Sequence, residues 1–147
     1  LGTEASVTNT ATVSGTGITP VTATETVNAE AAPNLAITKS VSPVPVTENG
    51  TLTYTFRIQN YGSVAATNTT GVVITDTFAP VLNNLTAALN GTAWTAATDY
   101  TYNEATGTFS STAGAITVPA ATYTQDSTTG AWVVTPGEST LVITGTV

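Results

Sequence analysis

The chain has 147 residues, which suits one domain of ordinary size with a hydrophobic core. Two basic residues stand against nine acidic ones, and the net charge of −7 would repel a phosphate backbone, which argues against a nucleic-acid partner. Neither cysteine nor histidine occurs, which removes disulfides, thiolate zinc sites and the usual general base, so we expect no enzyme, no cofactor and no metal centre.

Charged residues make up only 7% of the chain, while 41% of it is hydrophobic. Many of the hydrophobic residues alternate with threonine, a pattern typical of an all-β protein with a hydroxyl-rich surface. No apolar run is long enough to cross a bilayer, so no transmembrane segment is expected. The start lacks methionine and a signal-peptide pattern, which predicts a mature or excised piece, and the composition favours an extracellular, cell-surface location.

Two alternating segments open the chain and predict a pair of strands. In the first, "ASVTNTATVSG", four residues share one face: Val7, Asn9, Ala11 and Val13. In the second, "VTATETV", four more share one face: Val21, Ala23, Glu25 and Val27. The segment "AAPNL" breaks the pattern and predicts a linker near residue 32.

The next segment, "NLAITKSV", carries the single lysine of the chain on the apolar face of a predicted strand. Alternation puts Lys39 on the same face as Leu35 and Ile37, where burial would disfavour the charged ammonium form and leave a nucleophilic amine. Two ordinary alternatives remain open: a buried ion pair with Asp76, or a strand-end position from which the amine reaches solvent.

Residues 50–60 form the clearest predicted strand, with Arg57 on the outward face. In the strand predicted at "VVITDTF", alternation places Asp76 on the core face. Further short strands follow between the turn signals "NG", "TG" and "TPGES", and no window has a helical period. We therefore expect a β-sandwich with little or no helix.

The order of these motifs resembles the tandem conserved repeat domain of bacterial and archaeal surface proteins, catalogued as domain of unknown function eleven. The resemblance rests on "PNLAITKSV", "VTENGTLTYTFRIQNYGSVAATN", "VVITDTFAP" and "VTNTATVSG". That family is similar to the isopeptide-forming modules of Gram-positive pilins and collagen adhesins. The resemblance implies an immunoglobulin-like sandwich with Greek-key connections, used as a stalk or fibre unit.

In the pilin relatives a first-strand lysine bonds to a last-strand asparagine, assisted by an acid between them. Carried to this sequence, these residues are Lys39, Asn9 and Asp76. In the family "VTNTATV" closes a module, whereas here it precedes the lysine, so residues 1–32 look like the closing strands of a neighbouring module and residues 33–147 like the module itself. This arrangement implies head-to-tail homopolymerisation by donor-strand complementation.

Several alternatives stay open. Alternation also places Asn60 on the core face of its strand, so it could replace Asn9, although a turn is the simpler interpretation. Glu25 could replace Asp76 as the acid. A fragment of a tandem-repeat surface protein and a carbohydrate- or host-binding adhesin are the rival functions. The adhesin would use an aromatic platform built from Trp94, Tyr100, Tyr102, Tyr123 and Trp132, although core packing is favoured for these rings. Calcium at Asp99, Glu104 and Asp126 is disfavoured by their spacing.

Overall fold

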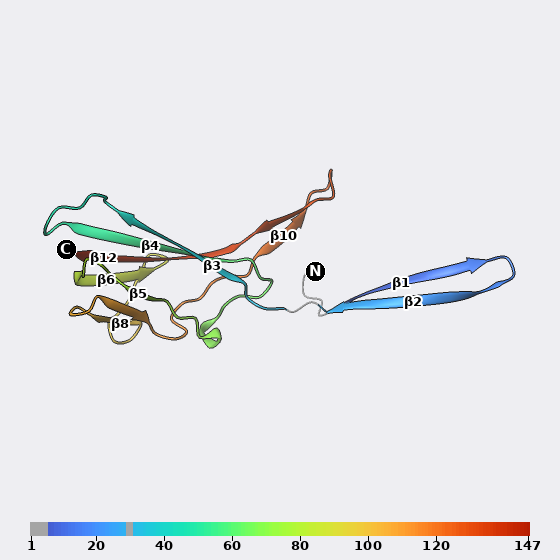
Figure 1. The fold of residues 1–147 in the computed structure, drawn as a ribbon, viewed down its shortest axis with the longest axis horizontal. Coiled ribbons are helices and arrows are strands. Elements are labelled where there is room, and N and C mark those ends of the chain that lie inside the picture. Colours follow the sequence, from blue (N-terminus) through green and yellow to red (C-terminus); the bar gives the residue numbers. More distant parts are fainter. Residues whose placement is uncertain (1–5, 29–30) are drawn as a thin grey trace.

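The computed structural model describes residues 6–28 and 31–147 and is all-β, as the alternation predicted (Figure 1). One short 3₁₀ turn, η1 (Asn68–Thr70), interrupts the strands. The strands are β1 (Ser6–Gly15), β2 (Ile18–Asn28), β3 (Leu35–Ser42), β4 (Thr51–Asn60), β5 (Thr75–Thr77), β6 (Asn83–Leu89), β7 (Thr92–Ala93), β8 (Tyr100–Asn103), β9 (Thr108–Ser111), β10 (Thr122–Gln125), β11 (Trp132–Thr135) and β12 (Gly137–Thr146).

Two antiparallel sheets form the body of the molecule. The larger has five strands in the order β3-β4-β12-β6-β7, and the smaller has three in the order β5-β9-β8. Their facing side chains make one hydrophobic core, which is the arrangement of a β-sandwich. The largest fully buried hydrophobic side chains are Phe78, Phe109, Leu82, Ile116, Leu141, Ile143 and Val118.

Strand β4 shows how the sequence builds this core. Its burial alternates along the strand, and the inward residues are Leu52, Tyr54, Phe56 and Ile58. The Tyr54 ring packs against Phe78, with centroids 4.7 Å apart, and Phe78 continues to Phe109 at 6.2 Å. Such tilted aromatic pairs stabilise a core beyond the area they bury, so this chain of rings joins the two sheets.

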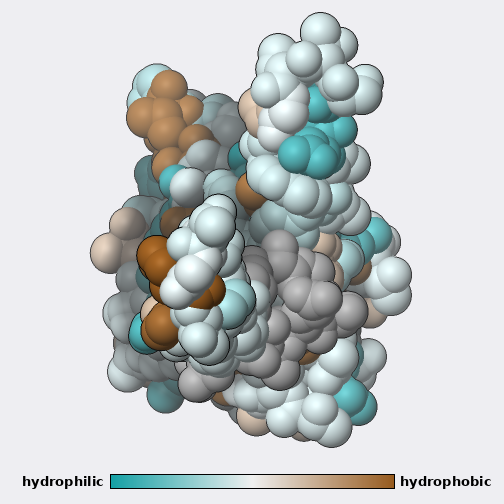
Figure 2. Space-filling model, turned by 90° about the vertical axis from the view of Figure 1, so that its right-hand side faces the viewer, coloured by the Kyte–Doolittle hydropathy of each residue, from teal (hydrophilic) through white to brown (hydrophobic). Residues whose placement is uncertain are grey.

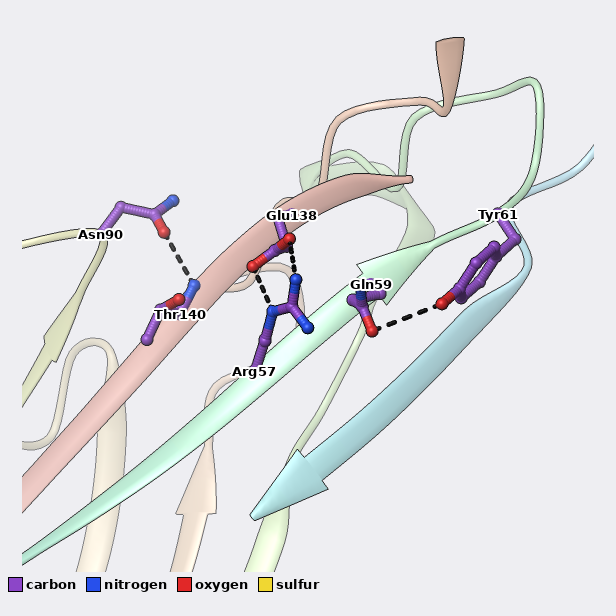
Figure 3. A network of polar contacts seen from close by, with 6 residues as sticks. All are labelled: Arg57, Gln59, Tyr61, Asn90, Glu138 and Thr140. Atoms are coloured by element: carbon purple, nitrogen blue, oxygen red, sulfur yellow. Dashed lines mark hydrogen bonds and ion pairs between the residues drawn. The ribbon is translucent and has the colours of Figure 1, made fainter. Parts of the chain in front are cut away.

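Polar side chains occupy the outer face of the larger sheet (Figure 3). Arg57 on β4 makes a two-pronged ion pair with Glu138 on β12, as expected for an outward-facing charge. The hydrogen bond from Arg57 holds the pKa of the Glu138 carboxyl below its usual value. Nearby, the side-chain oxygen of Asn90 accepts a 2.8 Å hydrogen bond from the Thr140 N–H. The outer face of the larger sheet is therefore covered by polar side chains that bond to one another and to the main chain.

Two hairpins stand apart from the body as separate two-stranded sheets (Figure 1). β1 and β2 form the longer one, which extends from the end of the sandwich where β3 begins. β10 and β11 form the shorter one and carry the exposed Trp132. Among the described residues, no helix is long and apolar enough to span a membrane.

Candidate docking groove and donor hairpin

Lys39 lies on β3, the edge strand of the larger sheet, directly opposite Phe56 of β4. Directly opposed residues share a face, so the lysine points to the core side as its parity predicted. Its ammonium forms an ion pair with the Asp76 carboxylate of β5. It also lies 4.8 Å from the ring centroid of Tyr54 and 5.2 Å from that of Phe78. The cation is thus held by one carboxylate and aromatic faces.

The expected burial of Lys39 is wrong for the single chain, because 40% of its side chain is exposed and 18% of that of Asp76. Every residue of β3 is exposed, including Ile37 at 53%. The physical reason is the unequal size of the sheets: the three-stranded sheet ends at β5 and leaves the inner face of β3 uncovered. Of the two ordinary alternatives, an ion pair with Asp76 is present, but it is partly open to solvent.

An apolar groove of about 160 Å³ lies between the two sheet edges, beside this ion pair. Its walls come from β3 and β4 on one side and from the segment before β5 on the other. They consist of Leu35, Ala36, Ile37, Ile58, Val72, Val73 and Ile74. Both edges are free in the described chain, since β3 and β5 each end their sheet. Free strand edges beside an apolar groove are a ready-made site for adding a strand.

The β1–β2 hairpin has two chemically different faces. On one face threonines stand opposite one another, and hydroxyls of Thr8 and Thr26 meet at 3.1 Å. On the other face Ala11 pairs with Ala23 and Val13 with Val21. This second face is apolar apart from one polar pair, Asn9 and Glu25, which also lie directly opposite each other.

The apolar face of the hairpin is largely unburied. Val13 is 67% exposed and Val21 65%. In Figure 2, which looks at the molecule from the hairpin end, the segment nearest the viewer carries hydrophobic surface on one side and pale surface on the other. An isolated two-stranded hairpin is at best marginally stable in water, because it buries no apolar face. The hairpin therefore has the composition of a sheet element that lacks its second layer.

The structure brings together two of the three predicted site residues, Lys39 and Asp76, and leaves the third elsewhere. Asn9 lies on the projecting hairpin, where its neighbour across the strands is Glu25 rather than Lys39. Of the predicted donor residues, Asn9, Ala11 and Val13 have described, exposed side chains. Val7 has a described strand position, paired with Val27, but its side chain lies outside the described residues.

Asn60, the alternative to Asn9, has a different role. It is fully buried, and its side-chain oxygen accepts 2.9 Å hydrogen bonds from the N–H groups of Asn34 and Gly62. Its amide nitrogen donates to the carbonyls of Val64 at 2.7 Å and Pro119 at 3.0 Å. All of its bonding capacity is used to hold the turn after β4 against the start of β3, so it is not a free partner for Lys39.

The aromatic residues do not form one platform. Tyr100 is buried and stacks on Phe109 with centroids 5.4 Å apart, and the Tyr102 hydroxyl donates to the Leu82 carbonyl at 2.9 Å. Trp94 packs against the core. The remaining two, Tyr123 and Trp132, belong to the β10–β11 hairpin.

The three acidic residues considered for calcium bond to their own loops or stand separately. Asp99 accepts from the Thr95 N–H at 2.8 Å. Asp126 accepts from the N–H groups of Thr129 and Thr128, and the Thr129 bond above all lowers its pKa. Glu104 lines a shallow hollow beside Tyr102 instead.

Sequence reasoning missed the wall formed by Val72, Val73 and Ile74, and with it the groove. Two signals point to it. Val73 is a large apolar residue at an outward position, and the outward face of β3, "A-T-S", has neither the charge nor the proline that usually protects an exposed edge.

A scan against protein-family models and searches of curated proteins and of solved structures found no match.

Proposed function

We propose that this chain is a structural subunit of an extracellular filament or surface stalk. Copies join head to tail when the β1–β2 hairpin of one copy completes the open side of the next. The observation that carries this proposal is that one chain holds two complementary unfinished parts: a hairpin with an unburied apolar face and a sandwich with an open apolar groove. A head-to-tail contact extends into a filament when the rotation between successive copies does not close a ring.

Approximate energies support a strand-addition joint rather than a simple hydrophobic contact. Full burial of a valine or isoleucine contributes about 1.5–3 kcal/mol, so covering the exposed parts of Val13, Val21 and Ile37 contributes on the order of 3–5 kcal/mol. Association itself costs roughly 4–15 kcal/mol. Apolar burial alone therefore only offsets part of that cost. A ladder of main-chain hydrogen bonds, at about 0.5–1.5 kcal/mol each, supplies the remainder.

The same joint would bring Asn9 of one copy to Lys39 of the next. Inside the joint the Lys39 ammonium passes a proton to the Asp76 carboxylate with which it is paired, and the resulting amine attacks the Asn9 carboxamide carbon. A new C–N amide bond forms, the carboxamide C–N bond breaks, and ammonia leaves with the proton that Asp76 transfers. In the single chain Asn9 lies opposite Glu25 on the hairpin rather than beside Lys39, so the bond is confined to assembled copies.

The assembly is tested with a matched pair of variants on the hairpin. Val13→Asp places a charge on the apolar face, whereas Thr12→Asp places one on the threonine face next to it. Light scattering after size-exclusion chromatography should show assembly for wild type and Thr12→Asp, and monomers for Val13→Asp. Equal assembly of both variants would refute docking through the apolar face.

The covalent lock is tested separately by boiling assemblies in denaturant and recording intact masses. We expect species at multiples of the subunit mass, each lighter by the mass of one ammonia per link. These linked species should be absent from Asn9→Ala. Monomers of unaltered mass would show that the joint is noncovalent. If the native polypeptide holds several such modules in one chain, the same joints form between successive modules, and the native chain length distinguishes that arrangement.

A further inference from the structure

We infer which edge receives the hairpin and in which register, an inference that rests on the proposed function. β1 of one copy pairs antiparallel with the free edge of β5 in a second copy, and Asn9 lies beside Asp76. β2 then becomes the outermost strand. The smaller sheet then has five strands in the order β2-β1-β5-β9-β8, and it faces the five strands of the larger sheet.

The β5 edge has main-chain groups available for this pairing. The Ile74 carbonyl accepts from the Ser111 N–H at 2.9 Å, and the Phe78 N–H donates to the Gly107 carbonyl at 2.9 Å. Even-numbered residues therefore direct their main-chain groups toward β9. In an antiparallel ladder the residues between them point the other way, so Val73 and Thr75 direct theirs toward the free edge.

Extension of the smaller sheet also explains why β3 is uncovered. The inner face of β3 needs a layer opposite it, and strands added beyond β5 supply that layer, whereas a strand added beyond β3 would leave the same face open. The order β3-β4-β12-β6 corresponds to the A-B-E-D sheet of an immunoglobulin-type sandwich, with β5 in the place of strand C. In that arrangement a hairpin of two strands, F and G, follows strand C in the second sheet. The analogy gives β1 and β2 these places.

The register follows from side-chain chemistry. With Asn9 beside Asp76, the inward neighbours are Ala11 with Ile74 and Val13 with Val72. The outward neighbours are Thr8 with Thr77 and Thr10 with Thr75. These four pairs are matched, apolar inside and hydroxyl outside, while Thr12 lies beside Val73 on the outward side. A slip by two residues would bury Asn9 against Ile74 or Phe78 and Asp76 against an apolar side chain, which leaves polar groups without partners.

This register places Glu25 in the same row. Because Glu25 lies opposite Asn9 in the hairpin, the row across the extended sheet is Asp76, Asn9 and Glu25, and Lys39 faces it from the larger sheet. Glu25 is then a second carboxylate for the lysine, contributed by the donor copy. The polar pair on the apolar face of the hairpin, Asn9 and Glu25, thus meets the Lys39–Asp76 ion pair beside the groove. This match fixes a register that the threonine, alanine and valine side chains alone would leave undetermined.

The occupant is a second copy rather than the chain's own hairpin. Leu35 and Ile37 lie beside Val72–Ile74 and Lys39 beside Asp76, so β3 and β5 run in the same direction. β2 would run in that direction too, with Glu25 level with Lys39. Asn28 would then lie level with Ser42 at the far end of β3. To return from there to Leu35, the chain would have to run back along the length of seven strand residues, about 23 Å. Residues 29–34 span at most about 23–25 Å when straight, which leaves nothing for the two reversals.

Engineered disulfides test this geometry without interference, because the chain has no cysteine. An unlabelled Thr10→Cys chain is mixed with a ¹⁵N-labelled Thr75→Cys chain, assembled and oxidised. Directly opposed residues lie about 4.5–5.5 Å apart between Cα atoms, within the range that a disulfide bridges. Peptide mass spectrometry should find the mixed light–heavy disulfide as the main product. The matched control replaces Thr75→Cys by Ser40→Cys, an exposed residue of the β3 edge.

Predominant linkage to Cys at position 40, or equal linkage to both, overturns the inference while the proposed function stands. Wild-type protein that never assembles overturns both. Hydrogen exchange on wild-type material gives an independent readout: the amides of Val73 and Thr75 should gain protection on assembly. Protection that appears along β3 alone would contradict the β5 edge even if the cysteine variants fail to assemble.

Discussion

Replacement of Lys39 by methionine should affect assembly far more than folding. In the free subunit the Lys39 side chain is 40% exposed, and exposed ion pairs contribute about 0–1 kcal/mol, so Lys39→Met should change the free energy of unfolding by no more than that. In the proposed joint, before any amide bond forms, the hairpin would cover the site, and Lys39→Met would leave Asp76 and Glu25 together without their cation. Breaking a buried pair by removing one partner costs about 3–5 kcal/mol, which corresponds to roughly a 150- to 4,000-fold weaker association.

The control for this prediction is Arg57→Met. Arg57 is the other basic residue of the chain and also forms an ion pair, but it lies on the outer face, away from the groove. Denaturant unfolding of the monomer and concentration-dependent sedimentation measure the two effects. Assembly of Lys39→Met with the affinity of Arg57→Met would refute the placement of the lysine in the joint. A loss of more than about 3 kcal/mol in monomer stability would show that Lys39 is a folding residue instead.

Two further predictions concern the body of the subunit. Asn60→Ala removes four hydrogen bonds from a fully buried site and should lower the free energy of unfolding by roughly 3 kcal/mol or more, measured by denaturant titration; a loss below 1 kcal/mol would contradict the role assigned to its side chain. Arg57 holds the pKa of Glu138 below its unfolded value, so the pair stabilises the fold above the usual glutamate pKa and loses that effect as pH falls through the folded value. The difference in melting temperature between wild type and Glu138→Gln should therefore shrink between pH 6 and pH 3, and a difference that grows on acidification would contradict the sign.

The strands of the sandwich could be predicted because alternation is a local property. β4 shows it most clearly, since Leu52 to Ile58 alternate with outward threonines, and Arg57 lies where the pattern put it. The exposed state of Lys39 could not be predicted in the same way. Parity decides which face of a strand a side chain occupies, but whether another layer covers that face depends on strands far away in the sequence. Here the covering strands are absent from beside β3 in the described chain.

The candidate site was predictable only in part for the same reason. Alternation placed Asn9 and Glu25 on one face of the first two strands, and the structure pairs them directly. No local sequence pattern shows that this hairpin stands away from the sandwich. A turn was the simpler interpretation of Asn60, and its local bonds to Gly62 and Val64 agree with a turn. Its bonds to Asn34 and Pro119 could not be predicted, because these partners come from distant parts of the chain.

The central claim, that the hairpin of one copy fills the groove of another, is tested most directly by mixing two complementary variants. Val13→Asp disables the hairpin and keeps the groove, whereas Ile37→Asp disables the groove and keeps the hairpin. Each variant alone should remain monomeric by light scattering, and their mixture should give a species of twice the subunit mass and nothing larger. A mixture that stays monomeric, or either variant forming polymers alone, would contradict head-to-tail joining through these two surfaces.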